Sequence, residues 1–275
     1  HDVLPDVISG ASAGSIVAAL VGTRTNEELL EMLTPEVIYA GFSKWLKWQG
    51  FGKDGLFDST NLENALIELF DLTTFEEAYK KTGRHMTITV SPADLHQFSR
   101  LLNAKTSPNA IIAQAARASC ALPLVFSAVQ LKAKNQAGEI VPYIPNHRFA
   151  DGSINPLSTA FQVSGKRDAS GFMELSLRYA AKIAKINSIY AFDILENAIS
   201  HKATRLGIHK IRSIVDQQYL GNINIQPTST ITNVKQLILN PSLEGLTELF
   251  EHGERATWPQ LDIIKRNTII SKTLR

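Results

Sequence analysis

The sequence predicts an α/β fold, because segments typical of strands alternate along the chain with segments typical of helices. Two stretches carry this prediction. In "HMTITVS" (85–91) apolar and polar residues alternate as in a strand, whereas in "STNLENALIELF" (59–70) apolar residues recur at helical spacing. The chain has 275 residues, of which 44% are hydrophobic and 20% charged. This composition is typical of a globular protein with a sizeable core.

The first predicted pair of elements is a short strand followed by a helix, in "VISGASAGSIVAALVG" (7–22). Between them stands a Gly-x-Ser-x-Gly motif formed by Gly10, Ser12 and Gly14. A serine at a sharp strand-to-helix turn holds its hydroxyl away from the chain. We expect Gly10 and Gly14 to lie where a Cβ atom would clash. The alternative is a helix that starts close to a sheet without any catalytic role.

Ser12 is the candidate nucleophile of an ester hydrolase. The helix that begins after it presents free N–H groups and a positive dipole end beside the serine oxygen. The N–H of Ala13 is therefore a candidate donor to an oxyanion. A serine hydroxyl needs a base to take its proton. We select Asp151, in "FADGSINP", where Gly152 lets a ligand or another loop approach the carboxylate; the alternative is an ordinary Asp-Gly turn.

The remaining elements are predicted from local signals. "TNEELLEML" begins a helix that is capped by one of its first two residues. "TTFEEAYKKTG" is a helix that stops at Gly83, and "PNAIIAQAARASCALP" is a helix that ends before Pro123. We expect "LVFSAVQL" (124–131) to form a strand, and "EIVPYIPNHRFADGS" to form a strand, a turn and a short strand.

The pattern becomes largely helical in the second half of the chain. We therefore expect an α/β catalytic core over residues 1–165 and a mainly helical section over 166–275 that packs on it. No internal repeat or low-complexity linker interrupts the sequence.

Composition excludes several classes of function. A net charge of +2 is too small to indicate a nucleic-acid-binding protein. The single cysteine, Cys120, excludes an intrachain disulfide and a cysteine-rich metal site, and it fits a reducing, cytoplasmic compartment. The apolar run without charged residues at 7–23 is too short and too rich in serine and glycine for a membrane span. We expect neither a metal nor a cofactor.

A Ser–Asp–His triad is the competing arrangement, since three histidines follow Asp151 in the order used by α/β-hydrolases and two precede it. His201, His209 and His252 follow Asp151, and His85 and His147 precede it. His201 and His209 lie among lysines and arginines, and no histidine has a flanking pattern that singles it out.

Three motifs in order, "GASAGS", "RASCALPLVF" and "FADGS", resemble the patatin-like phospholipase family. The stretch "GERATWPQL" is similar to the subgroup of triacylglycerol lipases and lysophospholipid acyltransferases of lipid droplets. The resemblance implies a three-layer α/β/α core with a mostly parallel central sheet. It also implies a Ser–Asp dyad without histidine, in which Ser12 is the nucleophile and Asp151 the base, and a lipid ester as substrate.

The sequence departs from the family pattern in two places. The Gly-rich loop that precedes the serine in the family, and supplies most of the oxyanion hole, is not in this sequence. Asn155 and Pro156 follow directly on "DGSI", where the subgroup has a further segment. Two alternatives to a lipase therefore remain: a catalytically silent scaffold that binds lipid or a protein partner, and a lysolipid acyltransferase.

A lipid substrate predicts peripheral contact with a membrane or a lipid-droplet surface. The segment 199–215 combines isoleucine and leucine with basic residues and has no acidic residue, as in helices that lie on anionic headgroups. Trp45 and Trp48 stand beside lysines in a second such segment. For both segments the alternative is ordinary packing on the core. We assign Arg117 a structural role in preference to contact with a lipid phosphate.

Overall fold

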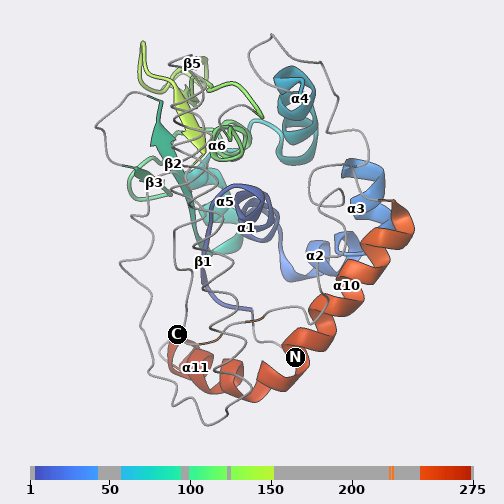
Figure 1. The fold of residues 1–275 in the computed structure, drawn as a ribbon. Helices are drawn as coiled ribbons and strands as arrows, with labels where there is room; N and C mark the ends of the chain where they lie inside the picture. Colours follow the sequence, from blue (N-terminus) through green and yellow to red (C-terminus); the bar gives the residue numbers. More distant parts are fainter. Residues whose placement is uncertain are drawn as a thin grey trace, which may run out of the picture.

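The computed structural model describes residues 4–42, 57–93, 99–122, 125–151, 223, 225 and 242–273. Their fold is α/β, as predicted (Figure 1). The strands are β1 (Val7–Gly10), β2 (His85–Pro92), β3 (Arg100–Leu102), β4 (Lys132–Lys134), β5 (Ile140–Pro142) and β6 (Phe149–Asp151). The helices are α1 (Ala13–Thr23), α2 (Asn26–Met32), α3 (Pro35–Phe42), α4 (Ser59–Phe70), α5 (Phe75–Thr82), α6 (Ile112–Ser119), α10 (Leu243–Thr257), the 3-10 turn η3 (Trp258–Gln260) and α11 (Leu261–Thr273).

The central sheet is built around β2. β1 runs parallel to β2, with Gly10 opposite Ile88, and β3 runs antiparallel to it on the other edge. β6 is also antiparallel, and Val90 pairs with both Arg100 of β3 and Asp151 of β6. Because one residue cannot pair with two strands on one edge, β6 lies on the same edge of β2 as β1, beyond the point where β1 ends. β4 and β5 form a separate antiparallel pair.

The helix boundaries follow the signals in the sequence. The side chain of Thr25 accepts a hydrogen bond from the Glu28 N–H, which completes a capping box at the start of α2. Thr74 does the same for α5, and Gly83 ends that helix in the left-handed conformation with φ 69°. These predictions are confirmed.

The strand predicted over 124–131 is wrong. Among the described residues of this stretch, the N–H groups of Val125 and Phe126 both donate to the carbonyl of Leu122, which makes a turn. Within the described ranges, an isolated bridge from Val129 to Phe149 is the only pairing that joins this segment to the sheet. The apolar residues that suggested a strand are used for packing instead, and Phe126 is buried.

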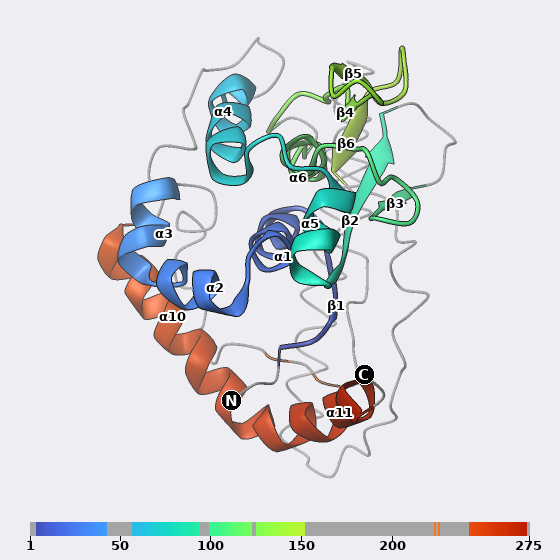
Figure 2. The same ribbon diagram turned by 180° about the vertical axis from the view of Figure 1, so that it is seen from behind.

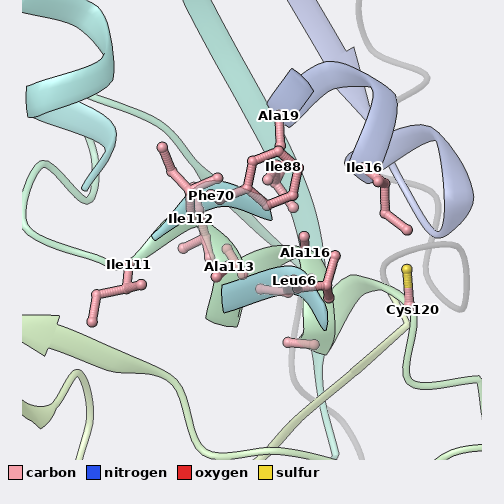
Figure 3. Packing of buried hydrophobic residues seen from close by; sticks show 14 of the residues in the cluster. Ile16, Ala19, Leu66, Phe70, Ile88, Ile111, Ile112, Ala113, Ala116 and Cys120 are labelled. Atoms are coloured by element: carbon pink, nitrogen blue, oxygen red, sulfur yellow. The ribbon is translucent and has the colours of Figure 1, made fainter. Parts of the chain in front are cut away.

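The hydrophobic core lies between the sheet and helices α1, α4 and α6. Figure 3 shows Leu66 and Phe70 of α4 beside Ile112 and Ala116 of α6, with Ile88 of β2 behind them; all five side chains are buried. Burying each large apolar side chain contributes about 1.5–3 kcal/mol. Since α1 and α6 both pack on β2, the core fixes the two helix ends that surround the β1–α1 turn.

The C-terminal helices lie along the outside of this core, where α10 packs against α3 (Figures 1 and 2). The described helices include none with both the length and the apolar character needed to cross a membrane. The boundary predicted at residue 165 falls outside the described residues and stays a prediction. The same holds for the interfacial roles predicted for 199–215, Trp45 and Trp48.

Candidate active site

The β1–α1 turn holds Ser12 in an unusual backbone conformation, with φ 52° and ψ −131°. A positive φ is uncommon for a residue with a side chain, and such strain costs about 1–3 kcal/mol. Although Ser12 stands at the N-cap position of α1, its side chain makes no capping hydrogen bond. The hydroxyl is thus not used by the helix, which is the arrangement predicted for a nucleophile at a strand-to-helix turn.

Gly10 is required by close backbone contact. A Cβ atom at this position would lie 2.1 Å from the Gly14 carbonyl oxygen and 2.7 Å from the Ser15 nitrogen. Neither neighbour is a flexible side chain, so any larger residue must displace the turn. The crowding expected at Gly10 is confirmed.

Gly14 differs from this expectation. Among the residues that the structure describes, a Cβ atom built on Gly14 meets nothing within 4 Å. The steric reason predicted for Gly14 is therefore wrong within this part of the chain, because the position lies on the exposed side of the first helical turn.

The backbone of Ser12 is held on both sides. Its N–H donates to the hydroxyl oxygen of Ser119 at 3.0 Å. Its carbonyl accepts hydrogen bonds from the Ser15 hydroxyl at 2.6 Å and from the Ser15 N–H at 2.9 Å. Ser15 and Ser119 are both buried, so these bonds are shielded from water.

The N–H of Ala13 has a different environment. Ala13 is the first residue of α1, and its N–H donates to no described residue, whereas the N–H of Gly14 donates to Ala11. The first N–H groups of a helix lack intrahelical acceptors and carry its positive dipole end. The predicted oxyanion donor is thus available beside Ser12.

Asp151 lies on the same edge of β2 as β1, at the end of a strand that runs in the opposite direction to β1. It is the last residue of β6, its side chain is 1% exposed, and its N–H donates to the Ala121 carbonyl at 3.1 Å. β1 ends opposite Ile88 and β6 ends opposite Val90 on the same edge of β2. Two residues of strand span about 7 Å, so the carboxyl ends of β1 and β6 face each other across that gap.

Residues at the end of α6 and just after it contact both the turn at Ser12 and the strand end at Asp151. Three consecutive residues make the contacts: Ser119 accepts from Ser12, the Cys120 sulfur lies 3.9 Å from the Ser15 hydroxyl oxygen, and Ala121 accepts from Asp151. Figure 3 shows the Cys120 sulfur pointing from this end of α6 toward α1. The motif "RASCALPLVF" by itself gives these three residues no role, because nothing local marks a serine as the partner of a residue 107 positions away.

The pKa of the Cys120 thiol depends on its burial and on the negative charge of Asp151. Burial raises the pKa of the Cys120 thiol to about 12, with a further contribution from the nearby negative charge of Asp151. The thiol is therefore neutral at physiological pH, and the group beside the candidate base is uncharged.

Arg117 is a structural residue, as expected. It is 1% exposed, it donates to the carbonyls of Ser59 and Ser127, and its guanidinium lies 5.5 Å from the centre of the Phe126 ring. Burial lowers the pKa of Arg117. These contacts tie α6 to α4 and to the turn after α6, so they support the helix end that carries Ser119.

The histidines offer no triad among the described residues. His85 lies opposite Val7 at the start of β2, about 17 Å along the strand from the level of Asp151, and stacks on Tyr79. His147 has its Nδ1 near the Pro145 carbonyl in the turn before β6. His252 is on α10. His201, His209 and the predicted site residue Gly152 lie outside the described residues.

No metal site is formed by the residues that the structure describes, since no three histidine, cysteine or carboxylate side chains come together there. The expectation that the protein needs no metal or cofactor stays a prediction.

Comparison with known proteins identifies a family that the chain matches. Residues 1–161 match the family model of the patatin-like phospholipases. Triacylglycerol lipase 4 of Saccharomyces cerevisiae is 34% identical over 97% of the chain, and triacylglycerol lipase ptl2 of Schizosaccharomyces pombe is 29% identical over all of it. Triacylglycerol lipase SDP1L of Arabidopsis thaliana is 30% identical over 97%.

The chain spans only part of these relatives, namely 34%, 49% and 38% of their lengths in the same order. The alignments run over 312, 316 and 317 positions, more than the 275 residues of the chain. The relatives therefore contain internal residues that have no counterpart here.

Proposed function

Because the chain belongs to the patatin-like phospholipase family, we propose that it is a serine hydrolase of lipid esters that uses Ser12 and Asp151 as a catalytic dyad. The names of its relatives, triacylglycerol lipases of two yeasts and a plant, support a lipid ester as substrate. The observation that supports the proposal is that the carboxyl ends of β1 and β6 face each other along one edge of β2, with Ser12 two residues after β1 and Asp151 at the end of β6.

In the proposed reaction the Ser12 oxygen attacks the ester carbonyl while its proton passes to Asp151. The oxyanion accepts a hydrogen bond from the Ala13 N–H, and the C–O bond to the alcohol then breaks as the alcohol takes the proton from Asp151. Water hydrolyses the acyl-enzyme in the reverse sense. A carboxylate is a weak base for an alcohol in water, and the burial of Asp151 supplies the dry setting that the dyad requires.

Transfer of the acyl group to a lysolipid would use the same acyl-enzyme, with an alcohol in place of water. The chemistry of Ser12 and Asp151 is common to both reactions, so the acceptor alone separates a hydrolase from an acyltransferase. We propose hydrolysis, as the names of the relatives favour.

We also propose that the protein works in peripheral contact with a membrane or lipid-droplet surface. Apolar side chains face outward along α10, η3 and α11, and helices with outward apolar and tryptophan side chains are typical of interfacial binding. These residues are Leu249, Trp258, Ile263 and Ile269, with Trp258 69% exposed. Co-sedimentation with phospholipid vesicles tests the proposal, and a chain that stays wholly in the supernatant contradicts it.

The dyad is tested by labelling the purified chain with a fluorophosphonate, which reacts only with an activated serine. We expect wild type to be labelled, Ser12→Ala to give no labelling and Asp151→Asn to lose about 10²–10⁴ in rate, the usual contribution of a general base. Ser107→Ala and Asp71→Asn are matched controls, since Ser107 contacts Tyr143 and Asp71 lies in the exposed turn after α4. Absence of labelling in folded wild type would favour the silent scaffold.

A further inference from the structure

Ser119 connects the β1–α1 turn to the sheet through a single hydroxyl group. Its oxygen accepts a hydrogen bond from the Ser12 N–H at 3.0 Å, and the same hydroxyl donates to the Thr89 carbonyl of β2 at 2.7 Å. Ser119 is 0% exposed. We infer that Ser119 is a positioning residue that sets the backbone, and thereby the nucleophilic oxygen, of Ser12.

The register of the sheet explains why a hydroxyl is needed at this point. Gly10 lies opposite Ile88 in a parallel pair, so a further step of the ladder would place Ser12 opposite Val90. In a parallel ladder an N–H binds the carbonyl of the residue before its opposite partner. The next bond would therefore run from the Ser12 N–H to the Thr89 carbonyl. The Ser119 hydroxyl stands between these two groups.

A hydroxyl suits this insertion because it donates one hydrogen bond and accepts others. The chain leaves the sheet at Ser12 to begin α1, yet neither the Ser12 N–H nor the Thr89 carbonyl is left without a partner. An alanine at position 119 would leave both groups in a buried site without this bridge.

The contact acts on the strained residue itself. The conformation of Ser12, with φ 52°, persists only where surrounding groups hold it. Ser15 holds the carbonyl side and Ser119 the N–H side. Of these two, Ser119 alone ties Ser12 to the strand whose other residues set the level of Asp151, so it fixes the nucleophile relative to the base.

The inference rests on the proposed function for its effect on catalysis, but the contact itself can be measured without activity. For Ser119→Ala we expect the maximal rate of fluorophosphonate labelling to fall by about 10–100-fold, because small displacements of reacting groups are costly. The reagent concentration for half-maximal rate should change little. Ser119→Thr, which keeps the hydroxyl, should recover most of the rate.

Ser107→Ala is the matched control, because Ser107 is also a buried serine whose hydroxyl bonds another side chain, that of Tyr143. It should lower thermal stability without the loss in labelling rate. Equal labelling losses in Ser107→Ala and Ser119→Ala would overturn the inference, since a general loss of stability would then account for both.

Amide hydrogen exchange at Ser12 provides the second measurement. In wild type the Ser12 amide should exchange more slowly than the Ala13 amide, because the Ala13 N–H donates to no described residue. In Ser119→Ala the Ser12 amide should exchange at least about tenfold faster than in wild type, because its hydrogen bond is lost. If wild type is not labelled, the proposed function fails and exchange alone decides the inference. If Ser119→Ala does not fold, the wild-type comparison decides it: a Ser12 amide as fast as that of Ala13 overturns the contact.

Discussion

Ser12 and Asp151 arrive at the same edge of β2 by different routes. Ser12 is held largely by its own neighbours in sequence, since Gly10 packs on Gly14 and Ser15 binds the Ser12 carbonyl, and the distant Ser119 adds a hydrogen bond to its N–H. Asp151 is placed almost entirely by distant segments. β6 pairs with β2, the Asp151 N–H binds Ala121, and Phe149 exchanges two backbone hydrogen bonds with Val129.

The difference shows that the two residues of the proposed dyad are positioned in unequal ways. The turn at Ser12 is a local structure whose shape follows from glycine and backbone geometry, whereas the position of Asp151 depends on the packing of a core around a three-residue strand. Changes to the first region should therefore affect chemistry more than stability. Changes to the second should affect stability first.

Phe149→Ala tests the long-range side of this comparison. Phe149 is 0% exposed, and its ring lies 6.0 Å from the Arg100 guanidinium. Removing a buried aromatic side chain should lower the free energy of unfolding by about 3–5 kcal/mol, measured by urea denaturation. Ile140→Ala, on an exposed strand residue, is the control and should cost much less. Similar losses for the two variants would mean that packing does not place β6.

Gly10→Ala tests the local side. The added Cβ would overlap the Gly14 carbonyl, so the turn must shift, and a shift of about 1 Å at a reacting group typically costs about 10²-fold in rate. We expect this loss in fluorophosphonate labelling, with the far-ultraviolet circular dichroism unchanged.

Gly14→Ala is the matched control for that variant. Its Cβ meets no described atom within 4 Å, and alanine favours a helix over glycine by about 1 kcal/mol. Gly14→Ala should keep most of the labelling rate and gain thermal stability. If the two glycine variants behave alike, the contact of Gly10 with the start of α1 is not what holds Ser12.

The same contrast explains what the sequence predicts and what it does not. Helices α2, α4 and α5 were predictable because their caps and apolar faces are local signals, and so was the strand-to-helix turn at Ser12. The segment 124–131 has the apolar residues of a strand but contains a turn, and apolar residues alone do not distinguish a strand from a turn packed on the core.

The site shows the same division. The serine motif and the Asp-Gly pair point to Ser12 and Asp151 as candidate site residues. The role of Ser119 depends on the register of β1 and β2 and on where α6 ends, which no short motif encodes. The sequence does not predict that Gly10 is crowded and Gly14 is not, because both glycines fit the motif and only the packing around the turn distinguishes them.

Cys120 allows a smaller and more selective test, since it lies between the two regions, near Ser15 of the turn and within the field of Asp151. Burial shields the Cys120 sulfur and raises the pKa of its thiol to about 12, so iodoacetamide should react slowly with the folded chain and quickly in urea. Since the pKa is raised, the rate should grow about tenfold for each pH unit between 8 and 10.

Asp151→Asn should increase the reactivity of Cys120, because it removes the negative charge that disfavours the thiolate. Ser12→Ala should leave that reactivity as it is, because no ionised group is lost. Both rates are measured by mass spectrometry of the alkylated chain at one pH. Equal rates in the two variants would mean that the carboxylate of Asp151 lies too far from the end of α6 to influence Cys120. One helix end would then not support both residues of the proposed dyad.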